Sequence, residues 1–133
     1  KGFHMKKLLL FLVLIFTTLN VYAKWEKVIT DKEADVYVKT DSIKRKGYII
    51  TVWEMIDYKS TQIADGRPFL SLKMKNEINC DTEENRTLFL APYSENMGFG
   101  EPLEHVKNFN KSVSTIVPDT IAHAIFKFVC SKK

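Results

Sequence analysis

The stretch Pro118–Cys130, which reads PDTIAHAIFKFVC, decides how the rest of the chain is arranged. Its apolar residues recur at spacings of three and four positions, the pattern of a helix that buries one face. They are Ile121, Ala124, Ile125, Phe128 and Val129. Asp119 is expected to cap the first turn, and Pro118 marks a boundary that helices rarely cross. Because Cys130 directly follows the stripe, we expect a short terminal helix fastened by its last residue onto a sheet.

The chain has two cysteines, Cys80 and Cys130. Cys80 closes the run Phe69–Cys80, in which apolar and polar residues alternate as in a half-buried strand. It falls on the apolar face of that run, where the helix is expected to pack, so a disulfide to Cys130 agrees with both patterns. Such a bond would close a loop of about 50 residues and contribute roughly 4 kcal/mol. Two buried free thiols and an intermolecular bridge are the alternatives.

Alternating patterns elsewhere predict a sheet. Strands are expected over residues 25–29, 34–39, 48–58, 69–80 and 86–94, with shorter candidates at 103–106 and 113–117. Residues 41–47 read as a turn with a basic tip, and residues 59–68 read as a loop rich in turn residues. The glycine-containing loop 96–100 carries Met97 and Phe99, and it either folds back onto the domain or forms an interaction site.

The predicted strand Tyr48–Tyr58 carries apolar residues on both of its faces. Its second face must therefore be covered by loops, by a neighbouring chain or by a ligand, because the terminal helix can cover only the first. Trp53 and Met55 lie on that second face, so we expect them to take part in self-association. Glu54 interrupts the first face and, if buried, needs a lysine or arginine partner. An ion pair explains it better than general-acid chemistry does.

The start of the chain has the features of an export signal. Residues 1–4 precede Met5 and are treated as extraneous. Residues 5–23 read as a signal peptide, with two lysines, an apolar run and small residues before a cleavage site. The run is shorter than the roughly 20 residues that span a bilayer. Cleavage is expected between Ala23 and Lys24, which leaves residues 24–133 as one domain in the periplasm or outside the cell. The alternative is an uncleaved membrane anchor.

Charge argues against nucleic-acid binding. The chain has 20 basic and 16 acidic side chains. Three basic ones, Lys1, Lys6 and Lys7, lie in residues 1–23, which hold no acidic residue, so residues 24–133 carry a net charge of about +1. A nucleic-acid-binding domain is normally strongly basic, so no nucleic-acid partner is expected.

Residues that typically build catalytic or metal sites are scattered. His105 and His123 have no second histidine or cysteine at ligand spacing, and a charged loop edge explains Glu101, Glu104 and His105 better than a metal site does. No serine lies in a Gly-x-Ser-x-Gly context, and no glycine-rich phosphate loop is present. We therefore expect a non-catalytic protein that uses no cofactor and no metal.

Several stretches taken in order carry a family resemblance. They are VWEMIDYK (52–59), GRPFLSLK (66–73), NRTLFL (85–90), YSENMGFG (93–100) and the terminal PDTIAHAIFKFVC. Together they resemble the surface-adhesin protein E family of Gram-negative bacteria over residues 25–130. The resemblance implies an α+β fold, with a six-stranded antiparallel sheet and a C-terminal helix held across one face by the Cys80–Cys130 disulfide. It also implies homodimers, adhesion to host cells and capture of host matrix and serum proteins.

One departure from the family bears on location. The family's best-known adhesin is a lipoprotein, whereas the expected cleavage site Val21–Lys24 has no cysteine to accept a lipid. The main expectation is an exported protein that binds proteins of the host or of the bacterial envelope. A soluble periplasmic protein that binds envelope partners is the alternative, and an enzyme with an unrecognised site is a weaker one. The resemblance assigns no ligand-contact residue to this chain.

We predict that the mature protein begins at Lys24. N-terminal sequencing of protein from fractionated cells checks this, with Ala23→Arg as a control, because a large charged residue next to the cut blocks signal-peptidase cleavage. A full-length product in the cytoplasmic fraction would contradict export.

Overall fold

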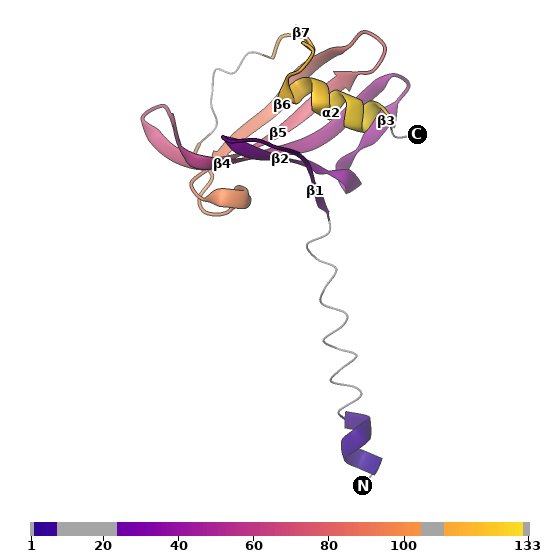
Figure 1. Ribbon diagram of the computed structural model, residues 1–133, viewed down its shortest axis with the longest axis vertical. Coiled ribbons are helices and arrows are strands. Elements are labelled where there is room, and N and C mark those ends of the chain that lie inside the picture. The colour runs from indigo at the N-terminus through magenta and orange to yellow at the C-terminus, as the bar shows by residue number, and fades with distance from the viewer. Residues whose placement is uncertain (1, 8–23, 105–110, 132–133) are drawn as a thin grey trace.

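The structure, a computed structural model, describes residues 2–7, 24–104 and 111–131 (Figure 1). Within these residues seven strands form one antiparallel sheet in the order β1-β2-β4-β5-β6-β7, with β3 also paired to β4. The strands are β1 (Trp25–Thr30), β2 (Ala34–Lys39), β3 (Lys44–Lys46), β4 (Ile49–Ala64), β5 (Arg67–Asn79), β6 (Glu84–Tyr93) and β7 (Ser114–Thr115). Two short 3-10 helices, η1 (Thr40–Ser42) and η2 (Asn96–Gly98), and the helix α2 (Ile121–Cys130) complete these elements.

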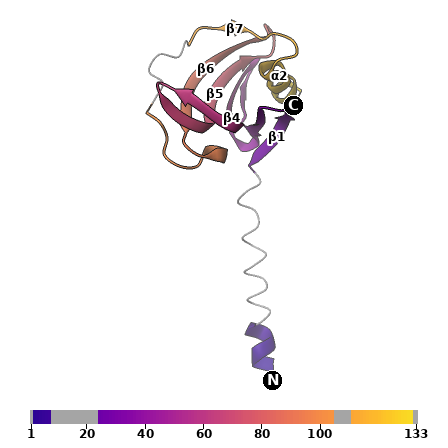
Figure 2. The same cartoon turned by 60° about the vertical axis from the view of Figure 1, so that its left-hand side comes forward.

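The helix α2 packs on one face of the sheet (Figure 2). Its Ile125 and Val129 are fully buried, as the spacing of apolar residues predicts. They pack in a core with alternate residues of three central strands and one residue that precedes the helix. These partners are Val36, Val38, Ile50, Val52, Ile78 and Ile116. The expected α+β fold, with the helix on one face, is therefore confirmed.

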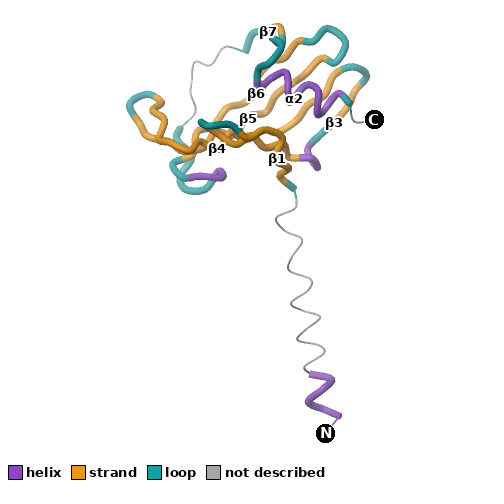
Figure 3. The backbone as a smooth tube through the Cα atoms, in the orientation of Figure 1, coloured by secondary structure: helices purple, strands orange, loops and turns teal. Residues whose placement is uncertain are grey.

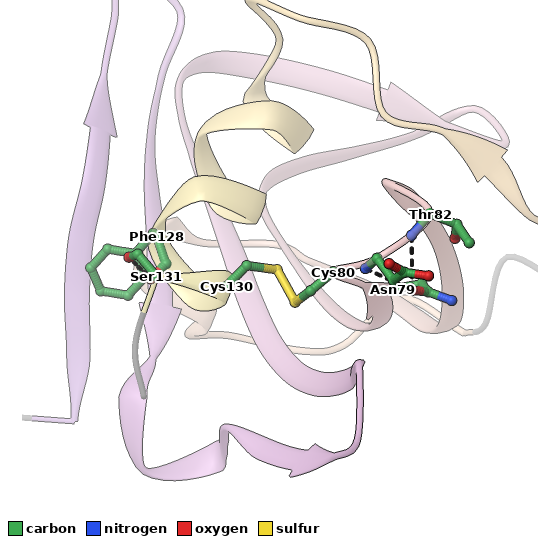
Figure 4. The surroundings of a disulfide bond; sticks show 7 residues. Asn79, Cys80, Thr82, Phe128, Cys130 and Ser131 are labelled. Carbon is green, nitrogen blue, oxygen red and sulfur yellow. Dashed lines mark hydrogen bonds between the residues drawn. A yellow bond between two sulfur atoms is a disulfide. The ribbon is translucent and has the colours of Figure 1, made fainter.

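A disulfide joins Cys80 to Cys130 and fastens the end of α2 to the end of β5 (Figure 4). The sulfur of Cys80 is well placed because the backbone around it is held on both sides. Its N–H donates to the carbonyl of Tyr48 at 2.8 Å, and the Asn79 side chain accepts from the backbone N–H groups of Asp81 and Thr82. The intramolecular pairing is confirmed, so the two alternatives for the cysteines are wrong.

The cap of α2 differs from the expectation. Thr120, not Asp119, is the capping residue, and its Oγ1 accepts from the backbone N–H of His123 at 3.2 Å. Asp119 has a positive φ of 64°, a left-handed conformation that turns the chain before the helix begins. Its N–H donates to Nδ1 of His123 at 3.2 Å, so the histidine links the turn to the first helical turn.

The sheet has more strand than the sequence patterns predict. The resemblance implies six strands, whereas seven are present, because residues 44–46 of the expected basic turn pair with β4 as β3. The expected loop over residues 59–68 is also wrong, since β4 and β5 continue as a hairpin that projects from the sheet (Figure 3). Its two-residue turn, Asp65–Gly66, has positive φ at both positions, the geometry that twisted hairpins favour.

The strand candidate at residues 103–106 is only partly described. Pro102 bridges to Tyr93, and the N–H of Leu103 donates to the carbonyl of Pro92 at 2.9 Å. Residues 105 and 106 lie outside the described part of the chain. The candidate at 113–117 contains β7, which pairs with the start of β6 and leads towards α2.

We predict that the disulfide supplies a large share of the stability. Cys80→Ala/Cys130→Ala should lower the free energy of unfolding by about 4 kcal/mol, because the 50-residue separation leaves a long loop open in the unfolded chain. Urea unfolding monitored by tryptophan fluorescence measures the change, with dithiothreitol-treated wild type as the matched comparison. A change under about 0.5 kcal/mol would show that the bond adds little to the packing of α2.

Candidate functional site

The face of the sheet turned away from α2, called the outer face below, carries a group of aromatic residues and lysines. Trp53 lies on it because its neighbours Val52 and Glu54 are buried on the opposite face. In the sheet register Trp53 pairs with Lys75, and Lys75 pairs with Phe89. The Trp53 and Phe89 rings meet edge to face, with centroids 5.5 Å apart. The aromatic rings therefore come together from β4 and β6 across the intervening lysine.

This arrangement continues to the edge of the sheet. Trp25 of β1 pairs with Lys39 of β2. Lys39 follows Val38, which pairs with Glu54, so the register places Lys39 beside Trp53. Aromatic residues and lysines thus alternate across five strands. The set Trp25, Lys39, Trp53, Lys75 and Phe89 is called the lysine–aromatic row below.

Acidic residues on the outer face already have partners. Glu77 forms an ion pair with Arg86 at 2.8 Å. Asp35 forms ion pairs with Lys27 and Lys59. A hydrogen bond to Asp35 and its charge raise the pKa of Lys27.

Three lysines of strands β2 and β5 on the outer face have no acidic partner within ion-pair distance among the residues described. They are Lys39, Lys73 and Lys75. Lys73 lies 4.7 Å from the centre of the Tyr93 ring. Burial, and then the positive charge of Lys39, lower the pKa of Lys73. The outer face therefore holds uncompensated positive charge.

One end of the outer face is closed by the loop that contains η2. The backbone N–H of Met97 donates to Asp57 Oδ1 at 2.8 Å, and the N–H of Gly98 donates to Ser71 Oγ at 2.8 Å. Gly98 has a φ of 71°, which favours glycine, and a Cβ here would lie 2.2 Å from Cε of Lys73, so a larger residue would require the end of that lysine to move. The interpretation of residues 96–100 as a folded-back loop is confirmed, although Phe99 itself remains exposed.

This closure changes the role of Met55. Met55 is fully buried within the domain, whereas Trp53 is only partly buried. Of the two residues expected to take part in self-association, only Trp53 can reach another molecule. Self-association itself stays a prediction.

On the helix side of the sheet, Glu54 is buried without a cation. Its exposure is 4%, and no lysine or arginine forms an ion pair with it in the described part of the chain, so the expected basic partner is wrong. Burial raises the pKa of Glu54 to about 7, and a hydrogen bond from Asn76 opposes this rise. Oδ1 of Asn76 is itself buried without a hydrogen-bond partner. The environment therefore favours the neutral carboxylic acid.

Two shallow pockets flank α2, and only the second is lined by titratable side chains, those of Asp31, Asp119, His123 and Lys127. The larger, about 360 Å³, lies beside β6 and β7 and is lined by uncharged side chains, among them Asn85, Thr87 and Thr120. The other, about 330 Å³, lies beside β1 and includes His123. His123 accepts from Asp119 through Nδ1 and stacks on Phe126, so its role is structural.

Other sequence-based candidates are placed as follows. Within residues 2–7, 24–104 and 111–131, no three metal-ligating side chains come together. His105 and Ala23 lie outside the described residues, and Lys24 immediately precedes β1. None of the described helices is both long and apolar enough to cross a membrane.

Comparison with known proteins identifies the family. The family model for surface-adhesin protein E matches residues 25–131, which include both cysteines and the whole lysine–aromatic row. The chain belongs to the surface-adhesin protein E family. A search of curated protein sequences finds no match.

Solved structures of a relative share the fold. A crystal form of Haemophilus influenzae protein E has a TM-score of 0.68 and 16% identity, covering 84% of this chain and 91% of that one. Protein E from non-typeable Haemophilus influenzae has a TM-score of 0.64 and 17% identity, covering 85% of this chain and 79% of that one. At such identities the likeness shows the adhesin E fold alone. Membership of the adhesin E family indicates an adhesin-like binding protein that is exported or at the surface.

We predict that Glu54 makes this adhesin E domain less stable as pH rises. Its pKa is about 7 in the folded state and 4.5 in the unfolded state. The contribution of the neutral acid to the free energy of unfolding is therefore complete below pH 4.5 and is lost as pH rises through 7. Glu54→Gln should therefore raise the free energy of unfolding at pH 8 by about 2 to 3 kcal/mol relative to wild type, and change it little at pH 4.5.

Urea unfolding at pH 4.5, 6 and 8 measures the difference between the two proteins. Glu77→Gln is the matched control, since that carboxylate is paired with Arg86 and its loss should not give this pH dependence. A constant difference between wild type and Glu54→Gln over this range would show that folding does not raise the pKa of Glu54.

Proposed function

We propose that this protein is an exported, non-catalytic binding protein whose ligands are proteins of the host surface or of the bacterial envelope. The observation that carries the proposal is the lysine–aromatic row on the outer face of an adhesin E domain. Aromatic residues are enriched where proteins bind one another, because they bury a large area at low entropic cost. Phe89 is exposed and the other four residues of the row are partly exposed, whereas the helix side of the sheet is packed against α2.

The titratable groups support binding rather than catalysis. Glu54, the carboxyl with the most perturbed pKa, is sealed in the core and reaches neither pocket. His123 is occupied by its contacts with Asp119 and Phe126. Catalysis needs a nucleophile or base that can reach substrate in a cleft, and these two groups do not provide it.

A soluble periplasmic protein that binds envelope partners is the second candidate. It is favoured by the expected cleavage before Lys24, where the sequence offers lysine rather than a lipid-accepting cysteine. Both candidates use the same binding face and differ in location.

Homodimer formation also belongs to this proposal. Two surfaces are available for it, Trp53 on the outer face and the edge strand β1, and the lysines around Trp53 favour the edge strand. An edge strand has unpaired backbone groups that a second copy can use, independently of the charges on the outer face.

We predict that the mature protein captures specific proteins from envelope and host-matrix preparations through the outer face. Trp53→Ala should reduce the captured amount by on the order of tenfold, since truncating a central aromatic typically costs more than 1 kcal/mol of binding energy. Lys127→Ala, an exposed change on α2, is the control that should bind like wild type. Equal capture by wild type and Trp53→Ala would exclude the outer face as the site.

Location is tested separately by protease treatment of intact cells. Digestion of the protein before the outer membrane is permeabilised supports the adhesin candidate. Protection until permeabilisation supports the periplasmic one. Capture of no protein from either preparation, together with a small molecule or metal bound to the purified protein, would overturn the proposed function.

A further inference from the structure

We propose that the outer face binds an acidic protein surface, whose carboxylates meet Lys39, Lys73 and Lys75 while its apolar centre covers Trp53 and Phe89. This inference rests on the proposed function and adds the chemistry of the partner. It is carried by the charge balance of the outer face and by the geometry of the aromatic pair.

The charge balance points to a ligand that brings negative charge. The carboxylates of the outer face are used within the domain. Asp35 and Glu77 form ion pairs, Asp57 accepts hydrogen bonds from the η2 loop, and Glu84 accepts one from Thr82 at the end of the sheet. The sheet register places the three lysines on the neighbouring strands β2 and β5 around Trp53 and Met55 of β4. Burial, and then the positive charge of Lys39, lower the pKa of Lys73. Like charges held together destabilise the free protein, and an anionic partner relieves this cost on binding.

The geometry of the Trp53–Phe89 pair favours a protein ligand over a nucleic acid or a polysaccharide. Trp53 and Phe89 meet at an interplanar angle of 64°, so the edge of one ring covers the face of the other. Nucleic acids bind aromatic residues through open, parallel ring faces on which bases stack, and sugar rings need the same open faces. The pair instead presents a compact apolar knob with 38% of Phe89 exposed. An apolar centre surrounded by charges is the usual arrangement of a protein interface.

The dimensions of the row suit a protein interface. It crosses from β1 to β6 over four strand spacings of about 4.8 Å, or roughly 19 Å. A standard protein interface covers about 800 Å² on each partner, which needs a patch of similar width. The row is therefore wide enough, across the strands, for contact with a partner domain.

A second copy of this chain is a poor occupant of the same surface. A two-fold dimer would place the same patch on both sides of the interface, so two surfaces that each carry unpaired lysines would come together. Juxtaposed like charges disfavour such pairing by several kcal/mol. If the protein forms dimers, they should use a sheet edge and leave the outer face available.

The test measures binding of the purified mature protein to immobilised poly-L-glutamate, with heparin and a single-stranded oligonucleotide of thymidine as other anionic probes. Lys39→Gln/Lys75→Gln removes two charges from the row. Lys32→Gln/Lys127→Gln removes two exposed charges elsewhere and is the matched control. Trp53→Ala tests the apolar centre, and thermal melts confirm that each variant is folded.

The row variant should weaken poly-L-glutamate binding by on the order of tenfold and the control by less than about twofold. Trp53→Ala should weaken it by about fivefold, which a purely ionic attraction would not show. Equal weakening by both lysine pairs would overturn the proposal, as would tighter binding to heparin or to the oligonucleotide. If the row variant still captures proteins as well as wild type does, the acidic-partner inference fails while the proposed function stands. If wild type captures none, the proposed function fails.

Discussion

The packing of α2 against the sheet is the constraint on which the rest of the structure depends. Ile125 and Val129 close a core formed by alternate residues of β2, β4 and β5. A helix of ten residues is too short to be stable by itself in water, so its position comes from this burial and from the disulfide at its last residue. A domain of about 110 residues has only a modest core, which explains why a covalent link matters here.

Because α2 covers one face, the other face must be made compatible with water by different means. At one end the η2 loop closes it through hydrogen bonds to Asp57 and Ser71, and Met55 is buried beneath. Across the rest, lysine stems lie between aromatic rings and keep their charged ends in solvent. The outer face is therefore divided into a closed half that adds stability and an open half that is available for binding.

Periodicity predicts the parts of this fold that are half-buried and regular. The apolar stripe of α2 correctly predicts which face of the helix is buried. Together with the alternation of Phe69–Cys80 it also predicts the disulfide, because burial of one face requires both patterns. The β4–β5 hairpin was missed although Asp65–Gly66 is a strong hairpin signal, because polar hairpin strands lack an apolar alternation. The lysine–aromatic row depends on register between distant strands, and burial of Met55 depends on where a loop folds. Neither the register of distant strands nor the position of a loop can be derived from a single sequence. Of the residues in the row, only Trp53 is therefore predicted from the sequence as a binding residue.

This domain contains two kinds of charged group without an ion-pair partner among the residues described: a carboxyl in the core and lysines on the outer face. Glu54 is buried without a cation, and it can lose its charge by taking up a proton near neutral pH, because its pKa is about 7. Lys39 and Lys75, in contrast, lie on the outer face without an acidic partner within ion-pair distance among the residues described. A partner that brings carboxylates would supply these two lysines with counter-charges. The core carboxyl therefore affects the stability of the fold, whereas the lysines of the outer face favour the binding of an acidic partner.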